Sequence, residues 1–196
     1  MSKAVLISIR PKWCELIASG EKTIEVRKTR PKLETPFKCY IYCTKPSFPH
    51  EDFFVFDAGT DKAKTFYGGG KVIGEFVCDK IDAYEYEYCT HPEIGMDYDC
   101  GDNWFCIDDA DLEKACLTYK EFRDYAGNKD VYGWHISNLV IYDEPKRIFD
   151  FVRPACERVS DCGAGCSYWC GSLRRCMRNY TVLFPPQSWM YVEELT

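Results

Sequence analysis

Apolar and polar side chains alternate with a period of two along much of this 196-residue chain, which is typical of β-strands. One early segment departs from that period: Trp13, Leu16 and Ile17 recur with helical spacing between Pro11 and Gly20. Proline favours the first turn of a helix and glycine its end, so a short helix is predicted there. A second short helix is predicted at residues 118–127. Strands are predicted at residues 5–9, 23–27, 37–45, 71–84, 134–143 and 188–195.

These elements predict an α+β protein that is mainly β, a mostly antiparallel β-barrel with short flanking helices. Residues 1–196 are expected to form one domain, since this length suits a single core. Proline- and glycine-rich residues 46–70 and acidic residues 85–117 are interpreted as insertions. Residues 153–180 are interpreted as a cysteine-rich C-terminal appendage. Gly74, inside the strand predicted at 71–84, is a candidate bulge.

The stretch SGEKTIEVRKTRP places opposite charges on a short apolar strand directly after the first helix. Ile24 and Val26 should point into the core. The opposite face of the strand should then be polar, and it either forms a solvated edge or lines a binding site. The residues of this polar face, with the lysine before it, are Lys22, Thr23, Glu25 and Arg27.

The next strand, FKCYIYCTK, also has two distinct faces. Its apolar face carries Phe37, Cys39, Ile41 and Cys43. Tyr40 and Tyr42 lie on the other face, and Lys45 follows at its end. Exposed aromatic rings beside basic residues can stack on single-stranded bases, so both tyrosines are candidate ligand contacts. The alternative is a barrel face that an insertion covers.

Charge is distributed unevenly along the chain, whose net charge is −6. Residues 1–45 contain ten Lys/Arg against four Asp/Glu, whereas residues 46–130 contain eight against twenty. A local basic segment in an acidic protein favours an anionic ligand bound at one place. It argues against broad, non-specific binding to a nucleic-acid backbone, which needs an extended basic surface.

Hydropathy gives no sign of membrane insertion, because no apolar run reaches the roughly 18 residues of a membrane-spanning helix. The apolar residues before Arg10 are also too few for a secretory signal. We therefore expect a cytoplasmic protein, in which most of the thirteen cysteines remain thiols.

The run SIRPKWCELIASGEKTIEVRKTRP, followed by FKCYIYCTKP, resembles the ASCH domain, a branch of the PUA-like superfamily. The order helix, G-x-K-x-x-E-x-R, strand, K-P carries the resemblance over about 45 residues. The cysteine-rich tail and the ending PPQSWMYVEEL look like ASCH proteins carried by bacterial phages and prophages. The resemblance implies a PUA-like barrel with a cleft beside the first helix. It also implies a ligand of the nucleic-acid type, RNA or a modified base or nucleotide.

Some members of the family that this chain resembles look like enzymes. One ASCH subgroup resembles amidohydrolases that deacylate N4-acetylcytidine with a lysine and a threonine of this motif. Lys22 matches that lysine, whereas Glu25 stands where the threonine nucleophile would be. Other ASCH members look like ribonucleases. If this chain is an enzyme, Lys22 and Glu25 are the expected catalytic pair, exchanging a proton.

The chemistry of the motif also suits binding. An arginine presents a planar fork to a phosphate or a base edge, and a glutamate accepts a hydrogen bond from an exocyclic amine. A lysine at the helix–strand junction can neutralise a phosphate. The main hypothesis is therefore RNA or modified-nucleotide binding beside this motif, with nucleic-acid or nucleoside chemistry as the alternative. A third hypothesis is an interaction protein whose acidic middle occupies a basic partner.

Five cysteines gather in a glycine-containing tail within 21 residues of each other, a spacing compatible with tetrahedral zinc. Four of them would close the coordination shell, so the predicted zinc would be structural. An iron–sulfur cluster and free thiols or disulfides are the alternatives. The candidate ligands are Cys156, Cys162, Cys166, Cys170 and Cys176.

Overall fold

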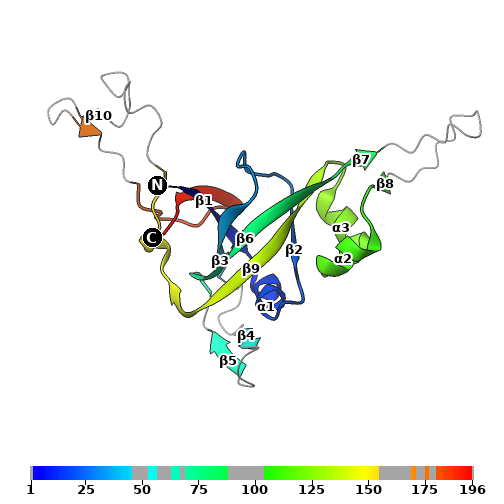
Figure 1. Ribbon diagram of the computed structural model, residues 1–196, viewed down its shortest axis with the longest axis horizontal. Coiled ribbons are helices and arrows are strands. Elements are labelled where there is room, and N and C mark those ends of the chain that lie inside the picture. The colour runs from blue at the N-terminus through cyan, green and yellow to red at the C-terminus, as the bar shows by residue number, and fades with distance from the viewer. Residues whose placement is uncertain are drawn as a thin grey trace, which may run out of the picture.

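The structure, a computed structural model, describes residues 2–45, 53–56, 63–66, 69–87, 104–154, 169–170, 175–176 and 180–195. Its centre is a six-stranded sheet with the strand order β12-β1-β3-β6-β9-β2 (Figure 1). Strands β1 and β3 are parallel, and the other neighbouring pairs are antiparallel. The six strands are β1 (Lys3–Ile9), β2 (Ile24–Arg27), β3 (Phe37–Cys43), β6 (Lys71–Tyr84), β9 (Val131–Lys146) and β12 (Trp189–Glu193).

This architecture confirms the predicted class, an α+β fold that is mainly β and mostly antiparallel. Among the described strands the sheet stays open rather than closing into a complete barrel, with β12 and β2 at its two edges. The predicted strand boundaries hold to within a few residues, although β9 is longer than expected. It extends to 16 residues because it pairs with β6 along almost the whole length of that strand.

Helix α1 (Pro11–Ala18) follows β1 and packs against one face of the sheet (Figure 1). Cys14 and Ile17 form its buried side. The helix ends before Gly20, whose φ of +82° is a conformation that glycine adopts without a Cβ clash. The backbone N–H of Lys22 then donates to the Leu16 carbonyl at 2.8 Å. This turn fixes the point at which β2 starts, and with it the position of the G-x-K-x-x-E-x-R motif.

The two faces of β3 pack into two different clusters, as the alternation predicted. The cluster on the α1 side, the main core, contains Phe37, Cys39, Ile41 and Cys43, together with the fully buried Trp134 of β9. The cluster on the opposite side is closed by the chain that follows β9, including the short 3-10 helix η2 (Ile148–Asp150) and β12. Burial on both faces explains why this strand reads as nearly continuous apolar sequence.

Beyond β2, a smaller third cluster forms around α2 (Asp109–Lys114) and α3 (Tyr119–Ala126). Ile24 and Val26 of β2 pack into it, with Phe105 of the short strand β8 (Trp104–Phe105) and Phe122 of α3. The side chain of Thr118 and that of Glu121 cap the start of α3 reciprocally. Residues 85–117 were expected to be irregular with short helical pieces, and their described part from 104 to 117 contributes a helix and packs beside β2.

The long strands β6 and β9 pair along their length, with several register shifts in the pairing. One shift lies at Gly74, the predicted bulge, where an added Cβ would be 2.4 Å from the carbonyl oxygen of Val140. The close approach of the two backbones therefore excludes a side chain at this position.

Several predicted features lie wholly or partly outside the described residues. Within the insertion at 46–70, the backbone of β4 (Phe53–Phe56) pairs with β5 (Ala63–Phe66). Strand β7 (Tyr86–Glu87) pairs with β8. In the cysteine-rich segment, the backbone of β10 (Trp169–Cys170) pairs with β11 (Arg175–Cys176). Of the five candidate zinc ligands, Cys170 and Cys176 are described by their backbone alone, and Cys156, Cys162 and Cys166 lie outside the described residues. None of the described helices has the length and apolarity needed to cross a membrane.

Candidate functional site

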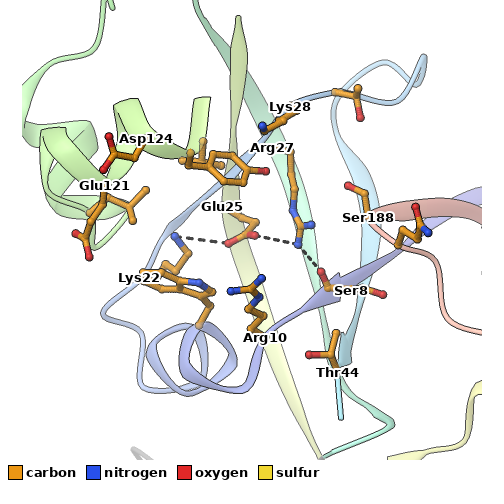
Figure 2. A pocket seen from close by; sticks show the side chains of 16 residues that line it. Ser8, Arg10, Lys22, Glu25, Arg27, Lys28, Thr44, Glu121, Asp124 and Ser188 are labelled. Carbon is orange, nitrogen blue, oxygen red and sulfur yellow. Dashed lines mark hydrogen bonds and ion pairs between the residues drawn. The ribbon is translucent and has the colours of Figure 1, made fainter. Parts of the chain in front are cut away.

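Three charged side chains of the motif converge on one another at the edge of the main core (Figure 2). The Glu25 carboxylate lies between two cations, with Oε1 at 3.0 Å from Arg27 Nη2 and Oε2 at 3.5 Å from Lys22 Nζ. Lys22, Glu25 and Arg27 are 3%, 6% and 8% exposed. A surface ion-pair cluster would be far more exposed, and so these contacts form a desolvated network.

Lys22 is fixed on three sides. Its Nζ donates to the Ala115 carbonyl at 2.6 Å and lies 4.9 Å from the centre of the Trp13 ring. Burial lowers the pKa of the Lys22 ammonium below its ordinary value, although the neighbouring Glu25 carboxylate acts in the opposite direction. Ala115 follows α2, so the second insertion helps to hold a residue of the motif.

Arg27 links β2 to the first strand. Its Nη2 donates to the backbone carbonyl of Ser8 at 2.6 Å as well as to Glu25. Its Nε is buried and has no hydrogen-bond partner within the described part of the chain. A buried N–H that is left unpaired costs free energy, and such a group is often satisfied by a ligand or a water.

The trio forms the floor of a pocket of about 810 Å³, which is within the range of small-molecule sites. Residues from α1, β2, α3 and the segment before β12 line it. In Figure 2, Glu121 and Asp124 of α3 lie on one side of the trio, Ser8, Thr44 and Ser188 lie on the other, and Arg10 lies below Glu25. The pocket therefore has an acidic wall, a wall of hydroxyl groups and one arginine.

Strand geometry explains why the charges lie on this side. Glu25 pairs with Trp134 of β9 in the antiparallel register, and cross-strand partners share a face of a sheet. Ile24 and Val26 point instead to the cluster around α2 and α3. The prediction that Ile24 and Val26 are buried is therefore confirmed, and Glu25 and Arg27 line a pocket beside the first helix as expected.

The other candidate residues are placed elsewhere. Thr23 is partly buried and bonds through its backbone, with its N–H donating to the Lys114 carbonyl at 2.9 Å. Lys45 is exposed and lies against Gly70. Neither residue lines the pocket.

Tyr40 and Tyr42 are not the exposed aromatics that base stacking would need. They are 0% and 4% exposed and pack in the cluster on the sheet face opposite α1. The Tyr40 ring contacts Phe151 edge to face at 4.9 Å, and its hydroxyl accepts the Leu195 backbone N–H. The stacking interpretation is therefore wrong, because the chain after β9 covers this face.

Several pocket residues were not predicted from the sequence. Arg10 and Trp13 lie at the start of α1, beside which the sequence predicted a cleft. A cation and an aromatic side chain at that place could have been recognised as candidate ligand contacts. Ser8, Tyr125 and Ser188 come from three separate segments and had no local signal. Only packing brings them to the motif.

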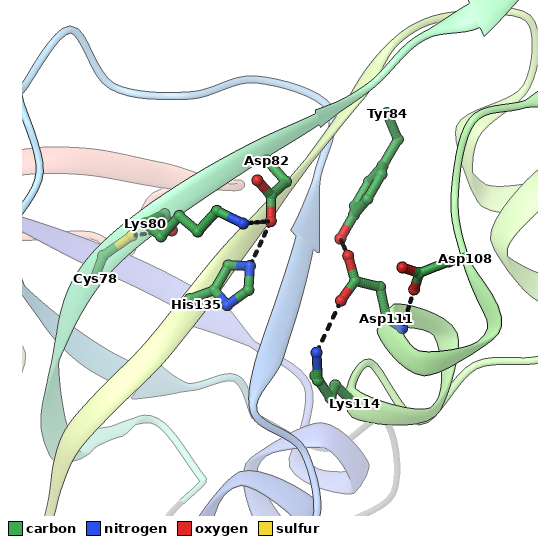
Figure 3. A network of polar contacts seen from close by, with 8 residues as sticks. All are labelled: Cys78, Lys80, Asp82, Tyr84, Asp108, Asp111, Lys114 and His135. Carbon is green, nitrogen blue, oxygen red and sulfur yellow. Dashed lines mark hydrogen bonds and ion pairs between the residues drawn. The ribbon is translucent and has the colours of Figure 1, made fainter.

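A second polar cluster lies on the paired strands β6 and β9 (Figure 3), and none of its residues lines the pocket. Asp82 Oδ2 is 2.7 Å from His135 Nε2 and 2.8 Å from Lys80 Nζ. Burial would raise the pKa of Asp82, but the hydrogen bonds from Lys80 and His135 lower it overall. Tyr84 donates to Asp111 at 2.9 Å, which links α2 to the end of β6. These contacts are consistent with a structural role.

Comparison with known proteins gives a family and a fold. The profile of the ASCH domain matches residues 7–145. A solved structure of ASCH from Zymomonas mobilis is 17% identical, with a TM-score of 0.51 over 97% of this chain and 88% of that chain. Two solved variants of the Zymomonas mobilis protein are 16% identical, with TM-scores of 0.51 and 0.52. They cover 98% and 97% of this chain and 92% and 89% of theirs. The search of curated proteins found no match.

At such low identity the solved structures support the fold alone, and the profile match carries the assignment. That match covers most of the chain and includes α1, the charged motif, β6 and nearly all of β9. The protein therefore belongs to the ASCH domain family, a family of PUA-like domains that in general bind nucleic acid.

Proposed function

We propose that this protein binds RNA, or a modified nucleotide, in the pocket above Lys22, Glu25 and Arg27. The observation that carries the proposal is the Arg27 side chain, which is 8% exposed on the pocket floor with an unpaired Nε. The pocket volume of about 810 Å³ has room for one nucleotide. An arginine that is already oriented by Glu25 and Ser8 through Nη2 can offer its remaining N–H groups to a base edge or a phosphate.

The polarity of the pocket supports an amphoteric ligand such as a nucleotide. Glu121 and Asp124 on one side can accept hydrogen bonds from base amines, whereas Arg10, which lies below Glu25 in Figure 2, suits a phosphate. Each Glu25 oxygen retains acceptor capacity after pairing with one cation. A purely phosphate-binding site would not place carboxylates along its wall, because like charges repel.

Binding is favoured over amide hydrolysis by the identity of residue 25. A carboxylate attacking an amide carbonyl would form a mixed anhydride, which is much further uphill than the ester that a threonine forms. Glu25 is also held on both oxygens by Lys22 and Arg27. Attack on a carbonyl carbon would have to break at least one of these two ion pairs.

Replacing Arg27 with lysine tests the proposal while keeping a positive charge beside Glu25. We expect the affinity for single-stranded RNA to fall by about tenfold to a hundredfold, since the planar fork and Nε are lost. Fluorescence anisotropy with a labelled mixed-sequence RNA would measure it. Arg147→Lys, at an exposed arginine directly before η2, is the matched control and should bind as the wild type does. Equal affinity of Arg27→Lys and wild type would remove the pocket as the binding site.

The lowered pKa of Lys22 leads to a pH-dependence of binding. The ammonium form, which neutralises ligand charge, is present below its pKa and is lost as the pH rises through it. RNA affinity should therefore decline between neutral pH and about pH 10, before an ordinary lysine would deprotonate. In Lys22→Arg the side chain stays charged, so the decline should be absent over this range. Parallel pH profiles for the two proteins would contradict this role for Lys22.

We also propose a structural zinc ion held by four of the five cysteines Cys156, Cys162, Cys166, Cys170 and Cys176. Elemental analysis of freshly purified protein should give about one zinc per chain, and Cys162→Ser or Cys166→Ser should lower that ratio. Cys106→Ser is the matched control, because Cys106 is an exposed free thiol outside this segment. A zinc content near zero in the wild type would contradict the proposal.

A further inference from the structure

Two aromatic side chains line the pocket from opposite parts of the chain. Trp13 comes from the first turn of α1, and Tyr125 comes from the last turn of α3. No direct ring contact joins them in the described part of the chain, although each stands beside the charged floor. Both residues line the same pocket.

Trp13 is held beside the floor by the motif itself. Lys22 Nζ lies 4.9 Å from its ring centre, and Lys12 Nζ lies 4.5 Å from it. Part of the indole also packs against the main core. Such contacts fix the orientation of the ring before a ligand arrives, which reduces the entropy lost on binding.

Tyr125 is held from the other end of the motif. Lys28 Nζ lies 5.2 Å from its ring centre. The residue is nevertheless 39% exposed. Core packing therefore does not account for the exposed part of this ring, which faces a pocket whose floor is charged.

We infer that Trp13 and Tyr125 are the stacking walls for one nucleobase, whose polar edge meets Glu25 and Arg27. The inference rests on the proposed function and narrows its ligand to one with an aromatic base, as opposed to a phosphate or sugar alone. A nucleobase has two apolar π-faces and a hydrogen-bonding edge. The pocket offers aromatic side chains at its walls and an acceptor and a donor at its floor.

The chemistry of the floor disfavours an apolar occupant. A hydrophobic peptide side chain between the rings would cover the charged groups of Glu25 and Arg27 without pairing the free Arg27 Nε. A base can satisfy that N–H with a ring nitrogen or a carbonyl oxygen, and its amine can donate to Glu25. Stacking is tolerant of sequence, so the edge contacts would set the preference for one base.

The experiment uses two probes of about twelve nucleotides, a mixed-sequence single-stranded RNA and an abasic strand with the same phosphates. Trp13→Leu and Tyr125→Leu should each lower the affinity for RNA about tenfold, a typical loss for one stacking contact. Trp13→Phe and Tyr125→Phe should retain most of the affinity, because they keep a ring. Affinity for the abasic strand should be the same in all four variants and wild type.

Tryptophan fluorescence gives a second measurement, which would not change on RNA binding if Trp13 had only a structural role. RNA should quench the emission of the wild type, the abasic strand should not, and the quench should be smaller in Trp13→Phe. Melting temperatures of all variants identify any loss of folding, and Phe149→Leu, at an exposed ring on η2 outside the pocket, should match wild type in every assay.

Two results would overturn the inference. One is RNA affinity in Tyr125→Leu equal to that of the wild type, and the other is an equal loss of affinity for RNA and for the abasic strand. If Arg27→Lys still weakens RNA binding in these cases, the proposed function stands and only the stacking walls are wrong. If Arg27→Lys has no effect either, the proposed function fails together with the inference.

Discussion

Replacing Glu25 with alanine should lower the free energy of unfolding by about 3–5 kcal/mol, the cost of breaking a buried ion pair from one side. The carboxylate lies between Lys22 Nζ and Arg27 Nη2, and both cations remain buried when it is removed. Two like charges would then face each other with little water to screen them. Urea denaturation followed by circular dichroism would measure the loss.

Two further variants make the test specific. Glu194→Ala removes a carboxylate that pairs with Lys38 at a more exposed site, where we expect a loss of under about 1 kcal/mol. Adding Lys22→Met to Glu25→Ala should recover part of the stability, because one of the two stranded cations is then gone. Equal denaturation midpoints for Glu25→Ala and wild type would show that the network is solvated in solution.

Trp134→Ala should also destabilise the protein by about 3–5 kcal/mol, because it opens a large cavity in the main core. Trp134 is 0% exposed, and the centre of its ring lies 6.0 Å from that of Phe37 and 6.1 Å from that of Trp189. The indole Nε1 has no hydrogen-bond partner among the described residues, so its removal leaves no partner unsatisfied. The loss therefore measures packing.

Thermal and urea unfolding would measure this effect, with Trp134→Phe as the conservative control. Phenylalanine keeps an aromatic ring beside Phe37, so we expect its cost to be less than half of that of alanine. Because Trp134 pairs with Glu25 across β2 and β9, folded Trp134→Ala protein should also bind RNA more weakly. A change of under about 1 kcal/mol in Trp134→Ala would mean that the core collapses around the gap.

Local sequence patterns were sufficient for the elements around the site. Pro11 and Gly20 predicted the helix bounds because each residue has a backbone preference that does not depend on its neighbours in space. The period of two in β2 correctly separated Ile24 and Val26 from Glu25 and Arg27, since successive side chains of any strand point to opposite faces. The resemblance carried by the motif then indicated which face to examine.

The same rule could not say what covers a face. On β3 the alternation correctly put Tyr40 and Tyr42 together, yet their burial depends on Phe151 and Val182, more than a hundred residues later in the chain. A polar tip on each tyrosine is compatible with both solvent and core. The chain after β9 decided between them.

By itself, then, the sequence determined the α+β class, the helix that precedes the motif, and the grouping of Lys22, Glu25 and Arg27 at its end. Those properties follow from backbone preferences and from spacing along one segment. Only the tertiary structure decided that the trio is buried, that Arg27 Nε lacks a partner, and that Trp13 and Tyr125 share its pocket. Burial and pocket shape depend on contacts between α1, β2 and α3, which are distant in sequence, and no local pattern encodes such contacts.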